Sequence, residues 1–182
     1  MSGVHISQIQ HANDVVLKKG TYILILGADL RPPHLSLLVD GKIFSLNVHG
    51  PQLEMPLEKQ LKLIKIRKIK SLFIRLNTSI YIHDNNLFKE AIKNTLIYSK
   101  IEPGLATCLS PVKNFCAGVF GIDTGRVQTI FDLLPLLYER QLISCCFHYN
   151  MEPLLVGNSF CLNTYTLQDI YYSICRRLEA VA

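Results

Sequence analysis

The chain has 182 residues, of which 49% are hydrophobic and 18% are charged. This length and balance predict a single globular domain over residues 1–182 and exclude a disordered chain. No apolar run approaches the roughly 20 residues needed to span a bilayer. Residues 1–8 also lack the basic and then apolar pattern of a signal peptide, so we expect a cytoplasmic protein without a membrane span.

The cysteines are expected to be free thiols, because the start of the chain shows no secretory leader. No C-x-x-C pair occurs, and no Cys/His spacing resembles a zinc site. We therefore expect neither a metal nor a cofactor. The six cysteines are Cys108, Cys116, Cys145, Cys146, Cys161 and Cys175.

The first half of the chain predicts a buried strand followed by a hairpin. Residues 22–27 form a continuous apolar run, which is typical of a strand buried on both faces. Asp40-Gly41 lies between two apolar runs, a strong signal for a two-residue hairpin turn. Continuing that register puts His34 opposite Asn47 on one face, with His49 one diagonal step away.

Residues 59–70 carry a concentrated positive charge. The apolar residues Leu57, Leu61 and Ile64 recur at helical spacing, so the basic residues are interpreted as the solvated face of a surface helix that opens at Pro56. Nucleic-acid binding is the weaker alternative, because no aromatic residue interleaves the lysines. We therefore expect no nucleic-acid partner. The basic residues are Lys59, Lys62, Lys65, Arg67, Lys68 and Lys70.

The remaining elements mix strands and helices without regular alternation, which indicates the α+β class. Strands are expected at 71–76 and 142–149, with 153–162 returning as the second strand of a hairpin with 142–149. Asparagines in the turn at 83–86 cap a helix that continues to Leu96, and Thr166 to Asp169 resembles a capping box that starts a terminal helix.

A central helix after residue 107 carries a cysteine at its front. Its start has two possible registers: Ser110 as N-cap with Pro111 in the first turn, or Thr107 as N-cap. In both registers Cys108 lies beside unpaired N–H groups and the positive end of the helix dipole. These surroundings favour a thiolate.

The order of these residues resembles that of the circularly permuted papain-like hydrolases, which include NlpC-type peptidases and lecithin:retinol acyltransferase. Residues 33–38 match the histidine strand of that group, Asn47 or His49 matches the orienting position, and residues 107–113 match the cysteine helix. Pro111 departs from the group, which usually has a small or apolar residue there. The resemblance covers residues 22–140 and implies a papain-like fold with an antiparallel sheet packed against helices.

The resemblance also implies acyl transfer. His34 would take the thiol proton of Cys108, and the thiolate would attack an amide or ester carbonyl of a small-molecule or peptide acyl substrate. Asn47 or His49 would hold the imidazole in its productive tautomer, and N–H groups at the helix front would bind the oxyanion.

Three alternatives remain open. Cys116 is a competing nucleophile, although it lies on the apolar face of the helix, where desolvation raises a thiol pKa. His148 would be the base in an unpermuted arrangement. In a different class of function, the chain is a non-catalytic interaction module on an α+β scaffold, as the 8 Tyr and 8 Phe would suit.

Overall fold

A seven-stranded sheet forms the centre of the protein. The computed structural model describes residues 3–78 and 87–179. Only the edge pair β2–β8 is parallel; the other neighbouring strands of this sheet are antiparallel. In spatial order the strands are β2 (Ile9–His11), β8 (Ile143–Tyr149), β7 (Ser71–Leu76), β3 (Thr21–Leu26), β4 (His34–Val39), β5 (Lys42–Asn47) and β6 (Gly50–Pro56).

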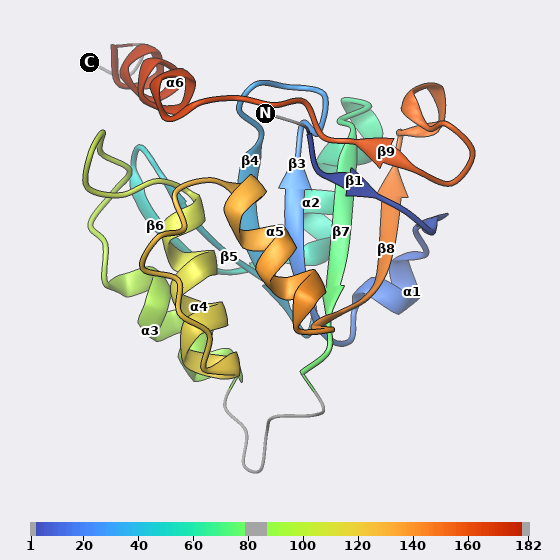
Figure 1. The fold of residues 1–182 in the computed structure, drawn as a ribbon, viewed down its shortest axis with the longest axis horizontal. Helices are drawn as coiled ribbons and strands as arrows, with labels where there is room; N and C mark the ends of the chain where they lie inside the picture. The colour runs from blue at the N-terminus through green and yellow to red at the C-terminus, as the bar shows by residue number, and fades with distance from the viewer. Residues whose placement is uncertain (1–2, 79–86, 180–182) are drawn as a thin grey trace.

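Helices cover both faces of this sheet (Figure 1). In the view of Figure 1, α3, α4 and α5 lie in front of the strands and α2 lies behind them. A small second sheet pairs β1 (His5–Ile6) with β9 (Phe160–Cys161). The helices are α1 (Asp14–Leu17), α2 (Leu57–Ile66), α3 (Leu87–Leu96), α4 (Leu109–Phe120), α5 (Ile130–Glu139), the 3-10 turn η1 (Glu152–Leu154) and α6 (Leu167–Glu179).

Strand β3 separates two hydrophobic cores, which explains its continuous apolar sequence. Ile23 and Ile25 belong to the core beneath α4 and α5, whereas Tyr22 and Leu24 belong to the core beneath α2. Side chains alternate along a strand, so a strand covered on both faces needs apolar residues at every position. The sequence prediction of a fully buried strand is confirmed. The predicted α+β class, with a mostly antiparallel sheet packed against helices, is confirmed as well.

The predicted hairpin is present in the expected register. Val39 pairs with Lys42, and the two residues between them, Asp40 and Gly41, have φ values of 42° and 77°. Positive φ at both central residues is what a type I′ turn requires. Strands β4 and β5 therefore bring His34 and the β5 side chains to one region of the sheet.

Two helix predictions are also confirmed. Helix α2 buries Leu57, Leu61 and Ile64 and leaves its lysines toward solvent. Helix α6 begins at the predicted capping box, in which the Thr166 amide donates to Asp169 and the Asp169 amide donates to the Thr166 hydroxyl.

One strand prediction is wrong. Residues 153–162 do not return beside β8, because both sides of β8 are occupied, by β7 and by β2. The segment instead forms η1 and a tight turn, and its short strand β9 pairs with β1. The expected turn at 83–86 lies outside the described residues. Among the helices described, none is long and apolar enough to cross a bilayer.

Candidate functional site

The front of α4 lies against the start of β4. The Leu35 amide donates a hydrogen bond to the sulfur of Cys108, at 3.4 Å. Leu35 follows His34 directly, so the thiol contacts the backbone next to the predicted base, while among the described residues no hydrogen bond joins the His34 ring to Cys108. The structure thus brings together two regions that the sequence separates by about 70 residues.

The His34 ring is held by a residue that the sequence analysis did not select. Its Nε2 atom lies 2.7 Å from the hydroxyl oxygen of Ser45 on β5. Burial lowers the pKa of His34 to about 4, and the positive charge of Arg177 contributes to the same shift. The imidazole is therefore neutral at neutral pH, and a neutral ring can accept a proton.

Cys108 is a neutral thiol in this structure. Burial raises its pKa, and the stabilising effects of the Leu35 amide and the Arg177 charge do not reverse that rise. The expectation that the helix front would favour a thiolate is therefore wrong for this conformation. Desolvation in the pocket outweighs the helix dipole, which is worth at most about 2 kcal/mol. Burial also raises the pKa of Cys116, to about 12, as its place on the apolar face of α4 predicts.

Cys108 occupies the N-cap position of α4, and Thr107 precedes it. The Thr107 hydroxyl accepts a hydrogen bond from the Leu109 amide, and its own amide donates to the Ser110 hydroxyl. Helix α4 begins at Leu109, directly after Cys108, so Ser110 lies in the first turn and is not the cap. These hydrogen bonds hold the backbone on either side of Cys108 at the front of the helix.

Asn47 and His49 are hydrogen-bonded to each other. The Asn47 side chain accepts a hydrogen bond from the His49 amide at 2.8 Å, and His49 is exposed. In the part of the chain that is described, no hydrogen bond joins either residue to His34. The predicted register would have identified Ser45: if His34 lies opposite Asn47, then Ser45 is a diagonal neighbour on the same face.

A narrow pocket of about 30 Å³ opens over Cys108. Pro33 and Leu35 line one side of it, and Ile174 and Arg177 of α6 line another. A volume of this size holds about one water molecule, so the pocket is closed to an acyl group. A larger pocket of about 220 Å³ lies next to it and shares Thr107 and Leu109 with it.

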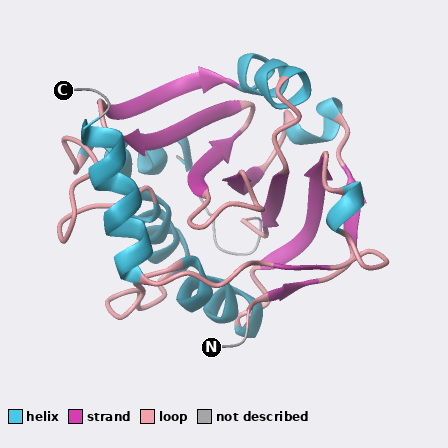
Figure 2. Ribbon diagram, turned by 90° about the horizontal axis from the view of Figure 1, so that it is seen from above, coloured by secondary structure: helices cyan, strands magenta, loops and turns pink. Residues whose placement is uncertain are grey.

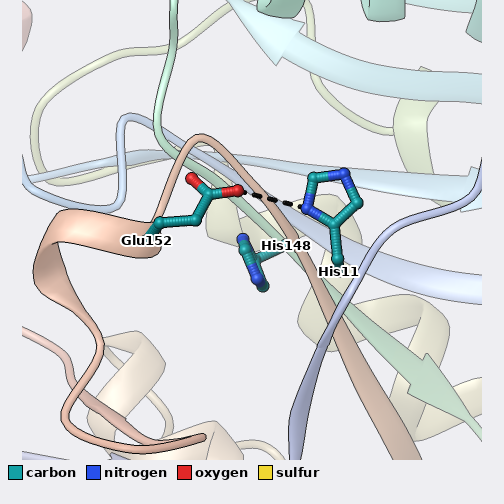
Figure 3. Close-up of side chains that lie close together, drawn as sticks. All are labelled: His11, His148 and Glu152. Atoms are coloured by element: carbon teal, nitrogen blue, oxygen red, sulfur yellow. Dashed lines mark hydrogen bonds and ion pairs between the residues drawn. The ribbon is translucent and has the colours of Figure 1, made fainter.

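His148 lies in a different cluster. Its ring centroid is 5.2 Å from that of His11, and Glu152 lies beside both residues (Figure 3). These three residues carry side chains of the kinds that bind metals. His148 comes from β8, which β7 and β3 separate from β4, the strand of His34. His34 adjoins the residue whose amide contacts Cys108, whereas His148 lies three strands away.

Comparisons with known proteins do not identify this chain: no protein-family model, curated protein sequence or solved structure matches it.

Proposed function

We propose that this protein is a cysteine hydrolase or acyltransferase of the circularly permuted papain-like type, with Cys108 as nucleophile and His34 as general base. The observation that carries the proposal is the contact between the Cys108 sulfur and the amide next to His34. The order of the elements supports it too, because a histidine strand within an antiparallel sheet precedes a helix that begins directly after a cysteine.

The uncharged state of the pair sets how catalysis would begin. With His34 neutral and Cys108 protonated, the imidazole accepts the thiol proton as sulfur attacks the carbonyl carbon. A sulfur–carbon bond forms, and the leaving amine or alcohol departs with the proton held by His34. Water or a second acceptor then releases the acyl group from Cys108. Ser45 holds the ring in position through both steps.

Helix α6 controls access to the thiol. Ile174 is 5% exposed and belongs to the same core as Leu109, so the helix is anchored over the front of α4. Displacing this part of α6 would join the narrow pocket to the larger one, where Lys113 and Gln128 offer polar groups to a substrate. In the described conformation the pocket over Cys108 is too small for an acyl group, so catalysis would require this displacement.

A covalent intermediate tests the proposal. The protein is incubated with a panel of activated esters, thioesters and amides, and acyl adducts are located by peptide mass spectrometry. We expect turnover of at least one probe and an acyl group on Cys108, with both lost in Cys108→Ala. Cys116→Ala is the matched control on the same helix and should retain both. Turnover that persists in Cys108→Ala, or an acyl group on Cys116, would contradict the proposal.

A non-catalytic interaction module on the same scaffold is the second candidate. The raised pKa of Cys108 is the observation that favours it, because a neutral thiol under a helix is poorly nucleophilic. This candidate predicts that no probe acylates Cys108 faster than the exposed Cys161 and Cys175.

A further inference from the structure

Three residues with metal-binding side chains meet at the edge of the sheet (Figure 3). His11 in β2 and His148 in β8 are register partners in a parallel pair, so their side chains point to the same face. Glu152 lies in η1, which follows β8 closely. Figure 3 shows the Glu152 carboxylate directed at the His11 ring, with the His148 ring beside them.

The distances among the three side chains suit the binding of one metal ion. His11 Nδ1 lies 3.2 Å from Glu152 Oε1, and one ligand atom from each of the three residues lies within 4.8 Å of the others. Ligand atoms around a tetrahedral Zn²⁺ ion, with bonds of about 2.1 Å, lie about 3.4 Å apart. The His11–Glu152 pair is close to this spacing, and the ligand atom of His148 lies within 4.8 Å of both.

One of the three side chains is buried and two are exposed, which suits the binding of an ion that enters from solvent. His148 is 4% exposed, and its Nδ1 atom has no hydrogen-bond partner among the described residues. A buried polar atom without a partner raises the free energy of the folded state. Rearrangement of the His148 ring to bind an ion would offset that cost. The side chains of His11 and Glu152 are 63% and 58% exposed, so an ion can reach them from solvent.

We propose that His11, His148 and Glu152 bind a divalent transition metal ion, with Zn²⁺ as the best match. Two imidazoles and one carboxylate form a ligand set that Zn²⁺ accepts, and water completes the tetrahedron at the exposed side. Hard cations such as Mg²⁺ and Ca²⁺ prefer oxygen ligands and fit this set poorly.

A simple ion pair explains less of this arrangement. An exposed His11–Glu152 pair contributes little to stability and leaves the buried Nδ1 atom of His148 without a hydrogen-bond partner among the described residues. A bound ion would instead connect β2, an edge strand of three residues, to β8 and to η1. The metal site shares no residue with the pocket over Cys108, so it does not depend on the proposed catalysis.

Metal binding by the full chain tests the proposal. Metals are first removed with a chelator, and a phosphine reductant keeps the cysteines reduced. Zn²⁺ is titrated against a chromophoric competitor, and Co²⁺ serves as a spectroscopic substitute. We expect one equivalent of Zn²⁺ to bind, with an affinity that falls as the pH is lowered because protons compete with the metal for its ligands. The Co²⁺ form should show the intense visible bands of four-coordinate nitrogen and oxygen ligation, without a thiolate charge-transfer band.

The variants assign the ligands. His11→Ala and Glu152→Gln change exposed side chains, so the fold should persist, and each should weaken Zn²⁺ binding at least tenfold. His5→Ala, which removes another exposed histidine, should leave the affinity unchanged. Absence of stoichiometric binding, unchanged affinity in both ligand variants, or a thiolate band in the Co²⁺ form would overturn the proposal.

Discussion

His34 is held as a neutral base by its surroundings. Burial and the Arg177 charge disfavour the imidazolium, while the Ser45 hydroxyl lies within hydrogen-bond distance of the neutral ring. The energetic consequence is a folded state that resists protonation of His34 more strongly than the unfolded chain does.

This difference predicts that His34→Gln flattens the pH dependence of stability. An unfolded histidine takes up a proton near pH 6.5, whereas folded His34 does so near pH 4. Between these values the unfolded state of the wild type binds more protons, so its stability falls as the pH drops from 6.5 to 4. This difference in pKa corresponds to a loss of up to about 3 kcal/mol in the unfolding free energy of the wild type at low pH. The variant should not show this loss.

Urea unfolding at several pH values between 4 and 7 measures this effect. The difference in unfolding free energy between wild type and His34→Gln should shrink steadily toward low pH. Two parallel stability profiles would show that His34 titrates normally in the folded protein.

At the scale of single elements, the β4–β5 hairpin positions His34 and Ser45 against each other. Its turn needs positive φ at Gly41, where a β-branched side chain is strained. Gly41→Val should therefore destabilise the protein by roughly 1–3 kcal/mol. Gly41→Asn is the matched variant with a smaller cost, because asparagine adopts positive φ more readily. Chemical denaturation measures both, and equal stability of the valine variant and the wild type would contradict the turn.

Helix α6 is the element that shields the thiol, and Ile174 is its anchor. Ile174→Ala should favour local opening of α6, because removing a buried isoleucine side chain typically costs 2–5 kcal/mol. Alkylation of Cys108 by a small reagent should then be about tenfold faster or more, since 1.4 kcal/mol already gives a factor of ten.

The control for this variant is Ile64→Ala. Ile64 is buried in α2 beneath the opposite face of the sheet, so its loss weakens the whole fold without touching α6. We expect its Cys108 labelling rate to stay close to wild type. Equal acceleration in both variants would mean that Cys108 becomes accessible only through global unfolding.

Elements with local signals were predictable from the sequence. The Asp40-Gly41 turn, the apolar face of α2 and the capping box of α6 each depend on residues close together in the chain. The register of the hairpin also implies Ser45 as a diagonal neighbour of His34, on the same face as the predicted Asn47.

Features that depend on distant segments were not predictable. The expectation of no metal rested on local Cys/His spacing, and no such spacing could reveal that His11 and Glu152, 141 residues apart, meet through the parallel pairing of β2 with β8. The rise in the Cys108 pKa depends on burial in a pocket that α6 helps to line, and no local pattern reveals that placement.

At the scale of the whole molecule, one sheet organises two cores and two candidate sites. Figure 2 shows the helices packed around the strands. The Cys108 pocket lies where α4 and α6 meet the start of β4, and the metal cluster lies at the β2–β8 edge. Because strands β7 and β3 lie between β8 and β4, the catalytic proposal and the metal proposal can be tested independently.

The most direct test of the catalytic claim is single-turnover acylation of Cys108 in wild type and His34→Gln. An activated ester is added at neutral pH, and the acyl adduct on Cys108 is followed by mass spectrometry. General-base assistance is typically worth 10²–10⁴-fold, so the variant should acylate Cys108 at least about a hundredfold more slowly. Cys161 and Cys175, which are exposed, serve as internal controls whose rates should not change. An equal rate of Cys108 acylation in the two proteins would contradict the account.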